Sequence, residues 1–207
     1  MPYHHIYRND AYPRLTGGTG KWRERVTRSE ARMISRMSGL PPKARILEVG
    51  CDHAVMLRML EKAGHEMHGV DVNEDAVRLA NHPRVRYGNA DAIPHQGNTF
   101  DVCIASHVIE HLEEPHRLVI EAHRVLKPGG KLILIYPWEL FRGMTIIPDV
   151  IFRGKPWRLL KEIHRNIFYP KNIQAMARIS AFSHVRSKLF WGFPFIFPQF
   201  ITVLQKN

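Results

Sequence analysis

Close to the end of its first quarter, the chain contains the stretch Ile46-Leu47-Glu48-Val49-Gly50-Cys51-Asp52-His53-Ala54. The pattern of apolar and turn-forming residues changes twice along this stretch. The apolar run at 46–49 has the length and bounding glycine of a buried strand. Gly50 allows the backbone to turn sharply and lets a ligand approach it closely. Apolar residues then recur at helical spacing across 54–63, and Gly64 ends that pattern. The stretch therefore predicts a strand, a tight turn and a helix.

The alternation of strands and helices continues along the chain. Beyond 45–49, strands are predicted at 67–72, 84–87, 100–105 and 132–136, with a break at 127–130. Helices are predicted at 21–38, from Asn73 onward and at 114–126. The last third predicts helices near 156–164 and 170–178, then strands at 182–190 and 199–204. We expect an α/β fold whose mostly parallel sheet has helices on both faces and an antiparallel C-terminal hairpin. Ligands of such sheets bind at the carboxyl ends of the strands, at the switch point.

Composition places the 207 residues in the ordinary globular class, with 44% hydrophobic and 24% charged residues. Two cysteines cannot form a disulfide framework, so we expect a cytoplasmic protein. The first thirty residues contain no apolar signal sequence. The longest uncharged run, 189–205, is interrupted by glycine and proline and is short for a membrane span.

The basic excess, 30 Lys and Arg against 19 Asp and Glu, is concentrated at the two ends of the chain. Residues 1–43 carry 9 basic and 3 acidic side chains, and residues 142–207 carry 11 and 2. The middle, 44–141, carries 10 and 14. The flanks are either a solvated surface or a face for an anionic partner, such as a substrate phosphate, a membrane surface or RNA.

The turn after the first strand also restricts which class of cofactor we expect the chain to bind. A dinucleotide fingerprint has three glycines and an acidic residue about 20 positions later. Here only Gly50 is present, whereas Asp71 follows 21 residues later. Asp52 would set a carboxylate beside a pyrophosphate, which disfavours an NAD-type cofactor. A cationic cofactor with a ribose and no phosphate would instead be favoured by Glu48 and Asp52.

Five segments in order resemble the class I S-adenosylmethionine-dependent methyltransferases, especially the small-molecule branch. They are I-L-E-V-G-C, H-G-V-D-V-N, G-N-A-D-A-I-P, F-D-V-C-I-A-S-H-V-I-E-H-L and R-V-L-K-P-G-G-K-L-I-L, covering about 44–137. The resemblance implies a Rossmann-like fold that binds S-adenosyl-L-methionine. It implies that Glu48 and Gly50 hold the methionine portion, Asp71 the ribose hydroxyls, and Val72 the adenine face. The full set of cofactor-binding residues that we expect is Glu48, Gly50, Cys51, Asp52, Asp71, Val72, Asn89, Ala90, Asp91, Ala92, Ser106 and His107.

The chain departs from the family at G-C-D-H-A, where G-x-G-x-G is usual. A bacterial tRNA adenine methyltransferase family carries a similar Gly-x-Asp-His-Ala turn, so the departure is compatible with cofactor binding. The amino-methylating nucleic-acid enzymes have an Asn-Pro-Pro-Tyr-like element after the fourth strand, whereas this chain has Ala105-Ser106-His107 there. This difference argues against membership of that group of enzymes.

No catalytic side chain is predicted firmly, because methyl transfer from a sulfonium can rely on alignment and desolvation. His107, His111 and His164 are candidate general bases, since imidazole titrates near neutrality. His107 and His111 are four residues apart and would share one face of a helical turn. Glu110 or Glu114 could complete a metal site with them, but we expect no metal. Cys51 and Cys103 are expected to be packing residues.

The chain is expected to divide into an N-terminal helical cap (1–43), the cofactor-binding core (44–137) and an acceptor-side insert with the C-terminal hairpin (138–207). Aromatic clusters at 138–157 and 189–198 are either core packing or a hydrophobic lid over the acceptor. We expect methyl transfer to a small hydrophobic or anionic acceptor, lipid-like compounds included, with peripheral membrane contact left open. The alternatives are a tRNA or rRNA methyltransferase, for which nucleic acid would be the partner, and a non-catalytic methyltransferase-like module. The oligomeric state is left open.

Overall fold

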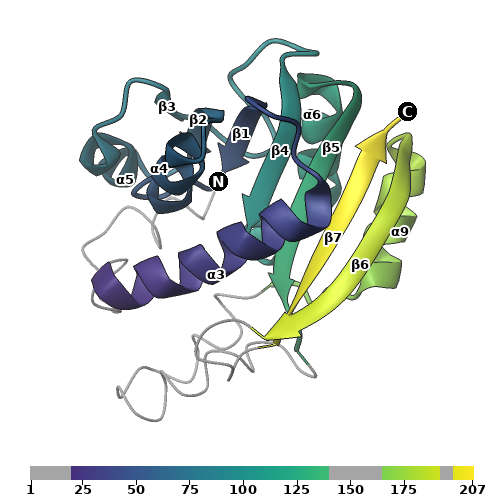
Figure 1. Cartoon of the computed structure of the whole chain (residues 1–207). Helices are drawn as coiled ribbons and strands as arrows, with labels where there is room; N and C mark the ends of the chain where they lie inside the picture. Colours follow the sequence, from purple (N-terminus) through teal and green to yellow (C-terminus); the bar gives the residue numbers. More distant parts are fainter. Residues whose placement is uncertain (1–19, 140–164, 192–197) are drawn as a thin grey trace.

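The computed structural model describes residues 20–139, 165–191 and 198–207, and it is built around one twisted sheet of seven strands (Figure 1). Their spatial order is β3-β2-β1-β4-β5-β7-β6. The strands are β1 (Arg45–Val49), β2 (Glu66–Asp71), β3 (Val85–Tyr87), β4 (Phe100–Ser106), β5 (Leu126–Pro137), β6 (Phe182–Trp191) and β7 (Pro198–Lys206). The helices are α3 (Gly20–Ser38), α4 (Val55–Lys62), α5 (Glu74–Ala80), α6 (Pro115–Val125) and α9 (Pro170–Ile179).

The strand directions confirm the predicted fold. Strands β1 to β5 run parallel, whereas β7 pairs antiparallel with both β5 and β6. Helices cover both faces of the sheet. One apolar cluster joins α3 and α4 to side chains such as Ile46 and Ile133, and the other joins α6 and α9 to Leu47 and Leu134. Because neighbouring residues of a strand point to opposite faces, these central strands are apolar at nearly every position.

The element boundaries agree with the sequence to within a few residues, with one clear exception. β5 begins at Leu126, so 127–130 is not the predicted break but an irregular start of the strand. The pairing with β4 shifts between Phe100 and Val102, and Gly129 takes a φ of 74° there. The helix predicted near 156–164 lies outside the described residues. Side chains of α3 and β1 pack in the same apolar cluster, so α3 is not a separate unit. The division of the chain into three parts with different roles stays a prediction.

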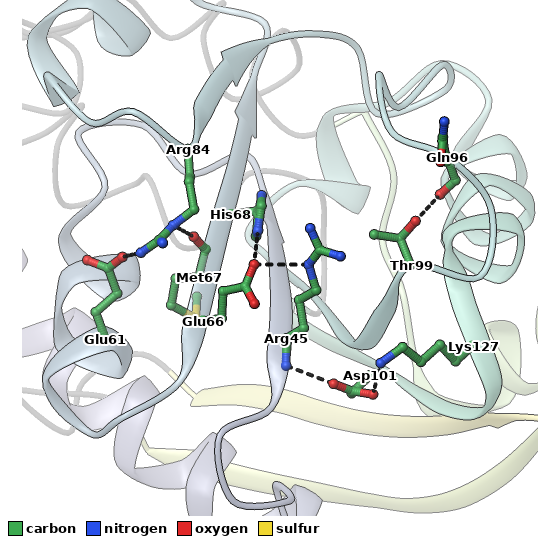
Figure 2. Close-up of polar contacts among 10 residues, drawn as sticks. All are labelled: Arg45, Glu61, Glu66, Met67, His68, Arg84, Gln96, Thr99, Asp101 and Lys127. Atoms are coloured by element: carbon green, nitrogen blue, oxygen red, sulfur yellow. Dashed lines mark hydrogen bonds and ion pairs between the residues drawn. The ribbon is translucent and has the colours of Figure 1, made fainter.

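The amino ends of the strands are joined by polar contacts (Figure 2). Asp101 accepts a 2.8 Å bond from the Arg45 backbone amide and a 2.7 Å bond from Lys127 Nζ. Glu66 forms an ion pair with Arg45, whose Nε lies 3.0 Å from Oε1, and it pairs with His68 Nε2 at 2.8 Å (Figure 2). These contacts connect β1, β2 and β4 at the amino ends of the strands, which is the end of the sheet opposite the turn after β1.

The carboxyl ends of β1 and β4 form the switch point, because the chain proceeds from β1 outward to β3 and then returns to β4. Here α3 crosses the sheet and comes close to the strand ends (Figure 1). Parallel α/β sheets bind their ligands at this position. None of the helices in the described ranges is both long and apolar enough to cross a membrane.

Candidate cofactor site

The turn after β1 adopts left-handed backbone at alternate residues. The φ angles are 75° at Gly50, 45° at Asp52 and 58° at Ala54. These are the three positions at which the family pattern G-x-G-x-G has glycine, the residue that adopts left-handed backbone at the least cost. Left-handed backbone costs an L-residue about 1–2 kcal/mol. The turn therefore carries strain at Asp52 and Ala54, beside the switch point.

Gly50 is required for packing as well as for its φ angle. Its amide donates to the Val70 carbonyl at 2.8 Å, which ties the end of β1 to β2. A Cβ at this position would lie 2.4 Å from Cγ2 of Val108, the residue after the β4 turn. The space that a Cβ on Gly50 would occupy is thus filled by the Val108 side chain.

Asp71 ends β2, and backbone amides hold its carboxylate. Oδ2 accepts from the Asp52 amide at 2.7 Å, and Oδ1 accepts from the Asn73 amide at 2.8 Å. Asn73 in turn caps α5 by accepting from the amides of Asp75 and Ala76. Since α5 follows Asp71 directly, the cap fixes where the carboxylate lies. A carboxylate oxygen can accept more than one hydrogen bond, which suits Asp71 to the expected contact with ribose hydroxyls.

Glu48 is a buried carboxyl at the carboxyl end of β1. Its residue is 5% exposed, and Oε2 has no hydrogen-bond partner among the described residues. Burial raises the pKa of Glu48 to about 8, and the charges of Asp71 and Glu30 add to the effect. A buried acceptor without a partner is costly unless a ligand supplies the donor. An ammonium or sulfonium ligand would supply charge of the right sign.

A second polar group follows β4, where Ser106 and His107 meet Glu30 of α3. Ser106 Oγ donates to Glu30 Oε2 at 3.1 Å, and His107 Nε2 lies 3.2 Å from Glu30 Oε1. His107 Nδ1 lies 3.3 Å from Glu110 Oε1, so the imidazole bridges two carboxylates. Its backbone is left-handed, with a φ of 55°, and its amide donates to Ile135 at 2.9 Å.

The two carboxylates decide the protonation of His107. Burial lowers its pKa, but the hydrogen bonds and charges of Glu110 and Glu30 outweigh burial and raise the pKa to about 10. At neutral pH His107 is therefore an imidazolium that donates from both nitrogens. The part of His107 as a general base stays a prediction.

The two histidines do not share a helical turn. His107 precedes the short 3-10 turn Ile109–His111, and His111 Nε2 lies 3.9 Å from the same Glu110 oxygen. In the described ranges, no group of three or more His, Cys, Asp or Glu side chains is placed to hold a metal ion. His164, the third candidate base, lies outside these ranges.

Residues 89–92 follow Gly88, which contacts the end of β2. The Gly88 amide donates to the Asp71 carbonyl at 3.0 Å, and Asn89 and Ala92 form an isolated antiparallel bridge. Ala90 is buried, whereas Asp91 is half-buried.

The two cysteines pack in the core. Cys51 Sγ would lie 2.7 Å from a Cβ on Gly69, and burial raises the pKa of Cys103 to about 12.

Glu30 is the site residue that the sequence analysis missed. It lies among the arginines of α3, yet it is 4% exposed. A signal was present, because Glu30, Ile34 and Met37 recur at the spacing of one helix face, and both apolar residues are buried. A charged residue on that face indicates a buried polar partner.

Comparison with known proteins agrees with this geometry. A family model described as a methyltransferase domain matches residues 22–182, most of the chain. The chain belongs to the class I S-adenosylmethionine-dependent methyltransferases. The cofactor of this family is S-adenosyl-L-methionine. The predicted family, fold class and cofactor are thereby confirmed.

Two curated relatives match the core of this methyltransferase. A probable S-adenosylmethionine-dependent methyltransferase of Mycolicibacterium smegmatis is 33% identical over 44% of this chain and 37% of its own length. A ubiquinone biosynthesis O-methyltransferase of Maricaulis maris is 30% identical over 43% of this chain and 39% of its own length. The matched region thus spans less than half of these relatives.

Solved structures resemble the chain over nearly its whole length. A methyltransferase from Thermotoga maritima described as a possible histamine N-methyltransferase has a TM-score of 0.71 and 19% identity, covering 99% of this chain and 100% of its own. A protein from Pyrococcus horikoshii has a TM-score of 0.73 and 20% identity, covering 96% of this chain and 100% of its own. At these identities the likeness establishes the fold.

The residues at the switch point fit S-adenosylmethionine. Glu48 offers a buried acceptor to a cation, and Asp71 offers an anchored carboxylate to ribose hydroxyls. The turn between them is held by backbone bonds to β2. The individual contacts of Glu48, Asp71, Val72, Asp91 and the other expected residues stay predictions.

Proposed function

We propose that this protein transfers the methyl group of S-adenosylmethionine to a small acceptor that is hydrophobic or anionic. The observation that supports the transfer most directly is Glu48, whose buried Oε2 has no partner in the described structure and faces an acidic environment. Glu30 and Asp71 contribute negative charge around it. Such a site favours a sulfonium cofactor and disfavours one that carries phosphates.

When bound, S-adenosylmethionine supplies an electrophilic methyl group on a positively charged sulfur. Around it, Asp71 would orient the ribose and Glu48 would hold the amino group. The buried strand ends exclude water, which strengthens these interactions. His107 already carries a proton at neutral pH, so its part is to hold the turn after β4 in place. Alignment and desolvation supply the acceleration without a general base from this turn.

The acceptor class rests on charge and on the relatives. Residues 142–207 carry 11 basic and 2 acidic side chains, which suits an anionic acceptor or one presented at an anionic surface. The relatives include enzymes named for ubiquinone biosynthesis and for phosphoethanolamine, one a hydrophobic compound and one a phosphate ester. Of the aromatic cluster at 189–198, Leu189 and Trp191 are exposed, Phe190 is buried and 192–197 lies outside the described residues.

A labelled-methyl screen tests the proposal. Purified protein is incubated with S-adenosylmethionine carrying a radioactive methyl group and with cell extract separated into lipid, small-molecule and RNA pools. We expect label in the lipid or small-molecule pool. Label that enters RNA alone would favour the RNA methyltransferase alternative, and steep salt dependence of binding would accompany it.

Two variants make the screen specific. Asp71→Ala removes the anchored carboxylate and should abolish most labelling. Asp75→Ala removes an exposed carboxylate that pairs with Arg78 on α5 and should label like the wild type. A folded wild-type protein that binds no S-adenosylmethionine in calorimetry would contradict the proposal and favour a non-catalytic module.

A further inference from the structure

We infer that Glu30 is a positioning residue of the cofactor site, which acts through His107 to hold the turn after β4 and to seat the N-terminal helix on it. The inference rests on the proposed function, because it concerns the site where the cofactor is proposed to bind. Glu30 belongs to α3, outside the strand-and-turn segments 44–137 that carry the family motifs.

The contacts show why Glu30 can act in this way. Its two carboxylate oxygens contact two neighbouring residues. Oε2 accepts a 3.1 Å hydrogen bond from Ser106 Oγ, and Oε1 lies 3.2 Å from His107 Nε2. Both partners lie at the carboxyl end of β4, which is one side of the switch point. A residue more than 70 positions earlier thus fixes two consecutive residues of the turn.

His107 needs such a restraint because its backbone is unfavourable. Its φ of 55° lies in the left-handed region, which costs a non-glycine residue about 1–2 kcal/mol. The side chain is 36% exposed, so burial alone does not hold it. The two charge-assisted hydrogen bonds, to Glu30 from α3 and to Glu110 from the 3-10 turn, supply the restraint.

The charge of the group is also informative. Glu30 and Glu110 flank the His107 ring, and His111 Nε2 lies 3.9 Å from the same Glu110 oxygen. Glu30 further raises the pKa of Glu48, so the group lies within electrostatic reach of β1. In a Glu30→Gln variant, His107 faces one carboxylate instead of two, and the cationic cofactor loses a nearby negative charge.

The test compares Glu30→Gln with Glu24→Gln in the full-length protein. Glu24 lies on the same helix and makes an exposed ion pair with Arg28, so it is a matched control. The His107 imidazole is followed by NMR as a function of pH, and affinity for S-adenosylmethionine and S-adenosylhomocysteine is measured by calorimetry. The NMR titration reports the contact itself, independently of any activity.

In Glu30→Gln we expect the His107 pKa to fall by more than ~1 unit and the dissociation constant for S-adenosylmethionine to rise about tenfold. The product has a neutral sulfur, so its affinity should fall less. Glu24→Gln should leave every value unchanged. If Glu30→Gln does not fold, Glu30→Asp keeps the charge but withdraws it by one methylene, and the His107 pKa should then fall part of the way.

Two results would overturn the inference. An unchanged His107 titration in a folded Glu30→Gln protein would show that the two side chains are not coupled. Unchanged cofactor affinity beside a shifted titration would show that the coupling does not reach the site. In either case the proposed function stands as long as the wild type binds S-adenosylmethionine. If the wild type binds neither ligand, the proposed function and this inference fail together.

Discussion

The backbone amide of Asp52 donates a 2.7 Å hydrogen bond to Oδ2 of Asp71. This bond joins the turn after β1 to the end of β2, the two elements that are expected to hold opposite ends of the cofactor. Because Asp52 has a left-handed backbone, its amide points back toward β2. The conformation of the turn and the orientation of the Asp71 carboxylate therefore depend on each other.

Asp71→Ala should weaken S-adenosylmethionine binding by about 1.5–3 kcal/mol, the range for hydrogen bonds to a charged group. The variant removes the expected ribose acceptor and the partner of the Asp52 amide. Isothermal titration calorimetry measures the effect. Asp75→Ala, an exposed carboxylate on the adjoining helix, is the control and should bind normally. Equal affinities for Asp71→Ala and the control would remove Asp71 from the site.

Ala54→Gly should leave the free energy of unfolding within about 0.5 kcal/mol of the wild type, because relief of the left-handed backbone offsets the greater freedom of the unfolded glycine. Ala76→Gly is the matched control, since Ala76 is equally buried but lies in helix α5. It should lose about 1–2 kcal/mol. Urea denaturation compares the two variants. Equal losses would mean that the turn is not strained at Ala54.

Affinity for S-adenosylmethionine should increase with pH up to about pH 8 and then level off. Burial raises the pKa of Glu48 to about 8, so the free protein holds this carboxyl protonated at neutral pH, whereas a cationic ligand favours the ionised form. Binding at pH 7 should therefore release a proton, measurable by calorimetry in buffers of different ionisation enthalpy. Glu48→Gln should lack the proton release that comes from this carboxyl. Because the ligand is the same in both experiments, the difference between the two proteins also corrects for titration of the ligand. Identical proton release in both proteins would contradict the assignment.

The protein should lose stability as the pH falls from about 6.5 toward 4. His95 packs edge-on against His68 and Phe100, with ring centroids 5.6 and 5.1 Å away. Burial, followed by the charge of Arg86, lowers the pKa of His95 to about 4. Because the unfolded chain takes up this proton at higher pH than the folded protein, acid favours unfolding across that interval.

Denaturation at a series of pH values measures the loss. His95→Gln removes one titrating group from the cluster and should make the decline shallower. His116→Gln, at an exposed position on α6, should keep the wild-type slope. A decline that is the same in all three proteins would assign the acid sensitivity to other groups.

The sequence was sufficient to predict the parallel strands because apolar runs and turn residues are local signals. β1 was predicted at its observed boundaries, 45–49, and β2 to within one residue. The start of β5 was missed because Pro128 and Gly129 are ordinary turn residues. Strand pairing with β4 overrides that preference, at the cost of a register shift.

The site was predicted less completely, since its polar contacts join distant segments. The acid at Asp71 follows from its distance to Gly50, and the resemblance names the rest of the pocket. The partnership of Glu30 with His107 spans 77 residues, and no local pattern connects them. The left-handed conformation at Asp52 and Ala54 could not be predicted either, because neither residue is glycine, the usual signal for it.

The position of β7 determines the order in which the sheet can be completed during synthesis. β7 follows β6 along the chain, yet it lies between β5 and β6 and pairs with both. Until residues 198–206 have left the ribosome, the backbone of β5 has no partner on that side, and β6 has none at all. The growing chain must therefore carry an open, apolar sheet edge, on which other chains can pair. The nascent protein is therefore most exposed to aggregation along this edge just before β7 emerges.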